Sequence, residues 1–231
     1  KERRFAMSAL SKLTLAPYQH LSPISEQVYT ALKEAVLSGA LPAGEHFTDT
    51  LVASHFSISR TPAREGLLRL EREGFLSSVS RKGFVVPDVR AQDARELYTV
   101  ALALEPAAVR LAAQVRTEED LARLKEILEQ EDLSVAGAAD TNFTFHIQLA
   151  QACGNQLLWD YIRQVREKMK LLHSFHDQAG SYPSTQAFLT RSKASHQQIY
   201  DAVAAGDGEL AELYLRRHLL IAQEHFLHAV T

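Results

Sequence analysis

The stretch at residues 57–76, SISRTPAREGLLRLEREGFL, constrains the fold of this chain more than any other segment. Three apolar residues recur at i, i+4 and i+7, which makes one stripe of a helix that faces a core: Ala63, Leu67 and Leu70. Arg60 and Arg64 are neighbours at i, i+4 and lie off that stripe. Pro62 falls in the first helical turn, where its missing N–H costs little. The pattern predicts a helix whose exposed start carries two arginines.

The segments around this helix predict a small DNA-binding module. TDTLVASHF is a short helix that begins near Thr48, and SIS separates it from the arginine-bearing helix. Two short helices joined by a tight turn, the second with a basic start, are typical of a helix-turn-helix. FLSSV and FVVPDV then flank SRKG, which indicates a β-hairpin with a basic tip at Arg81, Lys82 and Gly83. The alternative is a small helical domain whose arginines form a solvated face.

Arginine at a helix N-terminus suits a nucleic-acid partner for two physical reasons. The free N–H groups of the first turn attract a phosphate. The guanidinium fork matches O6 and N7 of guanine in the major groove. A net charge of -3 argues against binding of nucleic acid over the whole surface, but a local basic face remains compatible with it.

The module resembles the winged helix-turn-helix of the GntR family of bacterial transcription regulators. The matching pieces are VLSGALPAG, SRTPAREGLLRLEREG and RKG, in order over about 60 residues. The resemblance implies that Ser59 and Thr61 touch phosphates and that Arg60 and Arg64 enter the major groove of a double-stranded DNA operator. It also implies that Gly83 lets the wing approach the sugar edge. Some relatives carry a further arginine where this chain has Thr50, so we expect an operator of its own.

The rest of the chain differs in charge and in histidine content. Residues 21–90 hold 8 basic and 8 acidic side chains, whereas residues 91–231 hold 13 basic and 19 acidic ones, and seven of the ten histidines lie at or beyond position 146. Helical patterns with short connections run from about residue 91 to the end and predict roughly six helices in an antiparallel bundle. The fold class expected is mainly α, a winged helix-turn-helix followed by an all-α bundle.

Four segments follow from these patterns. We expect an N-terminal arm at 1–20, the DNA-binding domain at 21–88, a linker at 89–93 and the helical domain at 94–231. A single cysteine, Cys153, and no apolar run of the ~18–20 residues that span a bilayer predict a cytoplasmic protein with no membrane partner.

Three histidines occupy apolar faces of three different predicted helices: His146, His196 and His218. Facing helices are how bundles build metal sites, and three imidazoles with an oxygen ligand suit Zn²⁺, Ni²⁺ or Fe²⁺. Asn142 stands four residues before His146 on the same face. The alternative is that each histidine is an ordinary core residue.

This half resembles the all-α effector domain, called FCD, of the FadR-type branch of the GntR family, over roughly 94–228. The matching pieces are ELYTVALALEPAAVRLAA, NFTFHIQLAQACGN, SHQQIYDAVAAGD and RRHLLIA. The resemblance implies a divalent metal held by Asn142, His146, His196 and His218, with Asn142 in place of the family's aspartate. It also implies a homodimer.

The expected effector is a small metabolite such as a carboxylate. Many relatives carry an arginine four residues before Glu105, where this chain has Ala101. An acidic effector would therefore need another cation, and we expect the metal itself, Arg163 or Arg166, with His225 as a further pocket residue.

A ligand-responsive transcription regulator has two alternatives. A metal-dependent enzyme is disfavoured because no His-Glu-x-x-His pair and no obvious base accompany the histidines. The second alternative is a regulator whose bundle is purely structural.

Overall fold

The computed structural model describes residues 10, 13–14, 23–80, 82–88, 91–130, 135–178 and 185–230. The chain divides into two compact units, Lys1–Val89 and Arg90–Thr231.

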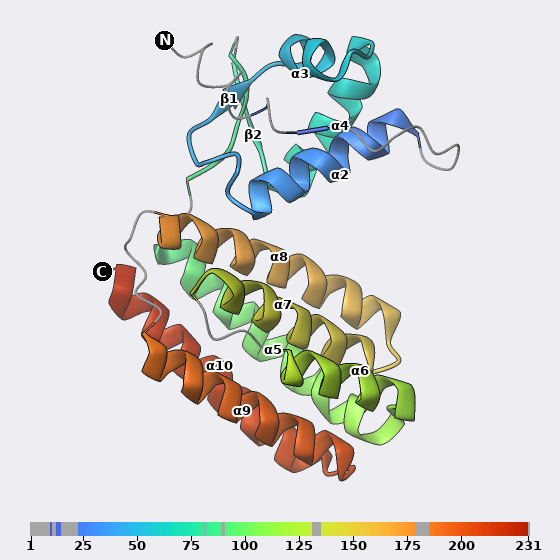
Figure 1. The fold of residues 1–231 in the computed structure, drawn as a ribbon, viewed down its shortest axis with the longest axis vertical. Helices are drawn as coiled ribbons and strands as arrows, with labels where there is room; N and C mark the ends of the chain where they lie inside the picture. The colour runs from blue at the N-terminus through green and yellow to red at the C-terminus, as the bar shows by residue number, and fades with distance from the viewer. Residues whose placement is uncertain are drawn as a thin grey trace. The chain divides into compact units, whose positions relative to one another are not determined.

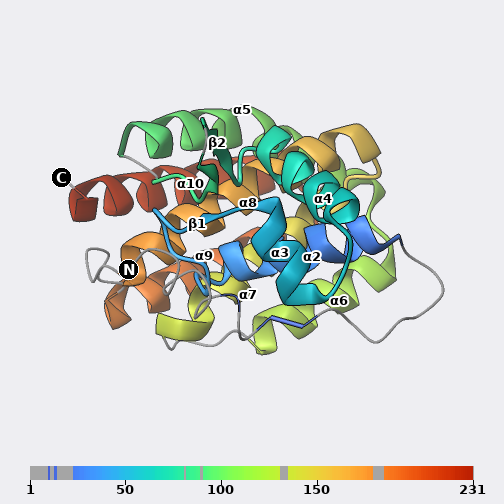
Figure 2. The ribbon, with the colours of Figure 1, turned by 90° about the horizontal axis from the view of Figure 1, so that it is seen from above.

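In the described part of the first unit, three helices join a small sheet (Figures 1 and 2). The elements in chain order are α2 (Ile24–Leu37), β1 (His46–Phe47), α3 (Asp49–Phe56), α4 (Arg60–Arg72), β2 (Ser77–Val79) and β3 (Gly83–Val85). The sheet is antiparallel with the order β1-β3-β2. The hairpin of β2 and β3 confirms the predicted wing, but β1 was not predicted, because two residues are too few to show an alternating pattern.

The predicted apolar stripe of α4 forms the centre of this unit. Ala63, Leu67 and Leu70 are fully buried, and α4 packs on α2 and α3. Ser59 is the N-cap residue of α4, so the helix begins at Arg60 with Pro62 in its first turn. Burial of one stripe leaves the opposite side of the helix start to the solvent.

The second unit is a bundle of six described helices with α5 at its centre (Figure 1). Their bounds are α5 (Ala91–Val115), α6 (Glu118–Glu129), α7 (Val135–Gln151), α8 (Gln156–Gln178), α9 (Gln186–Ala204) and α10 (Gly208–Val230). Thr117 caps α6 through a reciprocal capping box with Asp120. α5 begins at Ala91, inside the stretch that was expected to be a linker.

Pro106 lies inside α5, directly after Glu105. A proline has no N–H, so the carbonyl of Leu102, four residues earlier, loses its helical partner. Nη1 of Arg216 on α10 donates to that carbonyl oxygen at 3.4 Å. The proline is therefore tolerated because a neighbouring helix supplies the missing donor, and this contact adds to the packing of α10 on α5.

The described helices include none that is long and apolar enough to cross a membrane.

Gly83, at the start of β3, has a structural role that the sequence did not reveal. Its φ is +87°, and a Cβ on this residue would lie 2.6 Å from the carbonyl oxygen of Phe47 in β1. Gly44 has a similar φ of +80° but open space around the missing Cβ. The wing therefore requires glycine at position 83 both for its backbone conformation and for the close approach of β1.

We predict that Gly83→Ala destabilises the first unit more than Gly44→Ala. A positive φ costs a non-glycine residue about 1–2 kcal/mol in both variants, and only Gly83→Ala adds a clash with backbone. Urea unfolding followed by far-UV circular dichroism reports both units, and fluorescence of the single tryptophan, Trp159, reports the second. Equal shifts for the two variants, or a shift in the Trp159 transition, would contradict the prediction.

Candidate metal centre and nucleic-acid interface

Three buried histidines meet at one point inside the bundle. His146 comes from α7, His196 from α9 and His218 from α10. One ring nitrogen of each lies within 4.8 Å of those of the other two. The three sequence-predicted imidazoles are thus brought together by helices far apart in the sequence.

Hydrogen bonds fix the tautomer of His218. Oγ of Ser195 lies 2.7 Å from the carbonyl oxygen of Ser192 and 2.7 Å from Nδ1 of His218. A carbonyl can only accept, so the hydroxyl donates to Ser192 and accepts from the Nδ1–H of His218. Nε2 of His218 therefore carries a lone pair, and it points at Nε2 of His146 across 3.2 Å.

His146 is bound on its other side by a buried ion pair. Nε of Arg166, on α8, donates to Glu105 Oε1 on α5 at 2.6 Å, and Nη2 of Arg166 donates to Oε2. Nδ1 of His146 lies 3.0 Å from Oε2 of Glu105 and 2.6 Å from Nη2 of Arg166. The carboxylate favours a proton on Nδ1, and the guanidinium favours a lone pair there.

The donor set fits a divalent metal. If Nδ1 of His146 donates to Glu105, then Nε2 of His146 and Nε2 of His218 point lone pairs at each other. A cation between these two atoms would remove the repulsion of the lone pairs. A carboxylate behind a ligating histidine is the usual arrangement at metal centres. Burial, together with the charge of Arg166 and the neighbouring histidines, holds the pKa of His146 well below its usual range. The pKa of His218 is lowered in the same way by burial, His196 and Arg166. Both rings are therefore neutral, as metal ligation requires.

The predicted ligand Asn142 lies on α7, and the predicted pocket residue His225 lies on α10. Asn142 is half-buried on α7, one turn before His146. Phe145 stacks on His196 with ring centroids 4.4 Å apart and helps to hold that ring. The ring of His225 stacks on Phe188, with centroids 3.8 Å apart.

The two arginines expected to meet an effector have other partners. Arg166 is only 4% exposed and pairs with Glu105. Nη1 of Arg163 pairs with Glu167 at 3.2 Å, and its guanidinium lies over the ring of Trp159. Sequence spacing gave no sign of the Arg166–Glu105 pair, because the two residues are 61 positions apart on different helices.

Four of the predicted DNA-contacting residues lie at the start of α4, and all four are exposed. The side chains of Arg60 and Arg64 are 66% and 63% exposed. Asp49, in the first turn of α3, lies 3.0 Å from Nη2 of Arg60 and 3.8 Å from Nη1 of Arg64. Ser59 and Thr61 are exposed beside them. The carboxylate of Asp49, which sequence reasoning missed, holds the two guanidinium groups together.

On the wing, Lys82 is exposed and Gly83 is half-buried. Arg81 lies outside the described residues.

Comparison with known proteins gives a family match for each unit. Residues 24–86 match the family model described as bacterial regulatory proteins, gntR family, and residues 96–220 match the FCD domain. The chain is 31% identical over 205 residues to the probable D-xylose utilization operon transcriptional repressor of Paenarthrobacter nicotinovorans, with 85% of each chain covered. It is 25% identical over 202 residues to the transcriptional repressor RspR of Escherichia coli strain K12, covering 85% of this chain and 86% of RspR.

Among solved structures, the fold is similar to that of E. coli McbR/YncC. The TM-score is 0.76 at 26% sequence identity, and the alignment covers 90% of this chain and 99% of the other.

We predict that removing either Glu105 or Arg166 alone destabilises the bundle more than the separate contributions of the two residues suggest. Arg166→Met leaves a buried carboxylate without its partner and should cost about 3–5 kcal/mol of unfolding free energy. Adding Glu105→Gln should recover part of this loss. Urea unfolding followed by Trp159 fluorescence gives the coupling energy of the double-mutant cycle.

The exposed pair Glu119–Arg123 on α6 is the control. Its cycle should give a coupling of no more than about 0.5 kcal/mol. Additive effects of Glu105→Gln and Arg166→Met would contradict the prediction.

Proposed function

The chain belongs to the GntR family of bacterial DNA-binding transcription regulators and carries an FCD domain, and we propose that a small carboxylate bound at a metal ion in the helical domain controls its binding to an operator. The observation that carries this proposal is the convergence of three buried imidazoles whose ring nitrogens lie within 4.8 Å of one another. The relatives named above are regulators, which favours this function over an enzyme.

On the DNA side, we propose that Arg60 and Arg64 read base edges while Ser59, Thr61, Lys82 and Arg81 bind the phosphate backbone. The exposed guanidinium groups lie at the N-terminus of α4, where a recognition helix enters the major groove. Asp49 restricts both arginines before DNA arrives, which lowers the ordering entropy that binding must offset. A homodimer would present two such surfaces to two operator half-sites related by two-fold symmetry. We propose that the protein acts in the cytoplasm.

On the effector side, His146, His196 and His218 would hold the metal, with Asn142 as an oxygen donor. The metal would supply a Lewis-acidic site for a carboxylate oxygen of the effector. Glu105 would keep the proton of His146 on Nδ1, and Ser195 would accept the proton on Nδ1 of His218. Zn²⁺, Ni²⁺ and Fe²⁺ all accept imidazole and oxygen ligands.

Control of DNA binding requires that the effector and the operator prefer different conformations of the protein. A purely structural bundle would bind metal without changing operator affinity in response to a small molecule. A screen of small acids for a change in operator affinity separates these two functions.

We predict that Arg64→Ala weakens specific operator binding by about 10- to 100-fold, because one bidentate base contact contributes about 1–3 kcal/mol. The measurement is a gel shift at physiological salt with DNA from upstream of the protein's own coding region. Arg72→Ala is the matched control, because it removes the same charge from the far end of α4. Unchanged affinity of Arg64→Ala would disprove the assignment of the recognition helix.

We also predict about one metal ion per chain in protein purified without a histidine tag, since three imidazoles converge on one position. Elemental analysis should show that His218→Ala loses this metal and that His228→Ala, an exposed histidine of the same helix, keeps it. Metal-free wild-type protein, or metal retained by His218→Ala at full stoichiometry, would rule out the site.

A further inference from the structure

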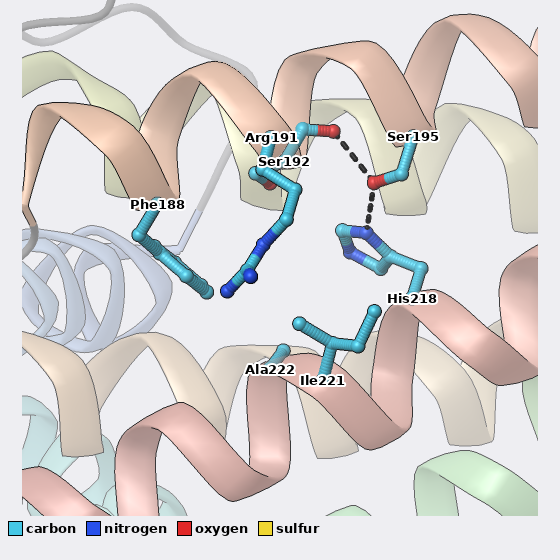
Figure 3. A pocket seen from close by; sticks show the side chains of 7 residues that line it. All are labelled: Phe188, Arg191, Ser192, Ser195, His218, Ile221 and Ala222. Atoms are coloured by element: carbon cyan, nitrogen blue, oxygen red, sulfur yellow. Dashed lines mark hydrogen bonds between the residues drawn. The ribbon is translucent and has the colours of Figure 1, made fainter.

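A cavity of about 30 Å³ lies between α9 and α10, beside the histidine cluster (Figure 3). It is lined by Phe188, Arg191, Ser192, Ser195, His218, Ile221 and Ala222. Its inner end is polar, with His218 and its hydrogen-bonded partner Ser195. The walls are apolar, and the opposite end carries a single cationic side chain, Arg191.

Arg191 reaches into this cavity from α9, toward the ring of Phe188 and the side of α10 that carries Ala222 (Figure 3). Its guanidinium carbon is 5.9 Å from the centroid of the Phe188 ring. That ring is in turn stacked on His225, so it gives Arg191 a firm support. In the part of the chain that the structure describes, no carboxylate lies within ion-pair distance of Arg191. Its charge is therefore available to a ligand.

The position of Arg191 differs from that of the other arginines near the cluster. Arg166 forms an ion pair with Glu105, and Arg163 forms one with Glu167. Neither is among the residues that line the cavity. Arg191 thus shares this cavity with His218, one of the three clustered histidines.

We propose that Arg191 binds a second acidic group of the effector, so that the ligand of this pocket is a short dicarboxylate rather than a monoacid. This inference rests on the proposed metal-bound carboxylate effector. One acidic group lies at the His218 end and the other at Arg191, with the carbon chain between Phe188 and Ile221. An arginine over an aromatic ring binds a carboxylate through two parallel N–H groups.

Helix geometry limits the length of this ligand. Arg191 and Ser195 are four residues apart on α9, and His218 and Ala222 are four apart on α10, so the two ends of the cavity differ by one helical turn. One turn rises ~5.4 Å. Carbon–carbon bonds of ~1.5 Å then require at least two carbons between the acidic groups, and the long stem of Arg191 can adjust the remaining distance. The small cavity also excludes bulky acids.

The test is isothermal titration of the full chain, loaded with Zn²⁺ and separately with Ni²⁺, using succinate and butyrate as probes. The two acids have the same length and differ in the second carboxylate. The wild-type chain should prefer succinate. Arg191→Met keeps the aliphatic stem over Phe188 and should weaken succinate binding by about 10- to 100-fold while leaving butyrate unchanged.

Two further variants make the result specific. Arg191→Lys restores the positive charge but not the two parallel N–H donors of arginine. Its affinity for succinate should therefore lie between those of the wild type and Arg191→Met. Arg217→Ala removes the same charge from exposed surface of α10 and should behave as the wild type. Circular dichroism checks that each variant is folded.

The outcomes separate this inference from the proposed function. If the wild type and Arg191→Met bind succinate equally, Arg191 is not the second anchor, although the metal-bound carboxylate stands. If butyrate binds as tightly as succinate to the wild type, the dicarboxylate is wrong. If neither acid binds the metal-loaded chain, the carboxylate effector fails and this inference fails with it.

Discussion

The buried ion pair of Glu105 and Arg166 is the interaction on which the helical unit depends. It joins α5 to α8, and through His146 it reaches α7 and then α10. Two charges in an apolar interior are costly unless each is hydrogen-bonded. Here every oxygen of the carboxylate faces a donor, so the cost is offset. Both members of the pair also contact Nδ1 of His146, where the carboxylate favours a proton and the guanidinium favours a lone pair, so the packing of the bundle is linked to the chemistry of the proposed metal centre.

A second carboxylate, Asp49, has a comparable part in the DNA-binding unit. It lies beside Arg60 and Arg64, where exposed guanidinium groups on flexible stems would otherwise adopt many rotamers. An exposed pair of this kind contributes little to stability. Its effect is on conformation, because it holds two arginines on one side of α4. In the proposed complex, phosphates and base edges would compete with Asp49 for the N–H donors of Arg60 and Arg64, which would favour DNA that offers good geometry over DNA that offers charge alone.

A feature of this structure could be predicted from the sequence when the residues that form it lie on one helix, and could not when it depends on contacts between distant segments. The stripe of Ala63, Leu67 and Leu70 follows from local periodicity, and the structure buries all three residues. The cluster of His146, His196 and His218 could be predicted because each histidine lies on the apolar face of its own helix. The strand β1, the Glu105–Arg166 pair and the cavity position of Arg191 depend on contacts between distant segments. A pattern along one helix does not contain that information.

The net charge of the proposed centre gives a reason why Asn142 and Arg191 occur in the same chain. The family's aspartate would cancel one charge of a divalent ion, whereas an amide cancels none. Glu105 and Arg166 neutralise each other, and His146 and His218 are neutral, so they do not change this balance. The centre would therefore keep two positive charges, and Arg191 adds a third at the other end of the cavity. Such a site lacks an anion of its own, and a dianionic ligand is the one whose charge best matches it. An asparagine at position 142 would thus weaken the proposed metal ligand set and, by leaving more positive charge, would strengthen its attraction for an acidic effector.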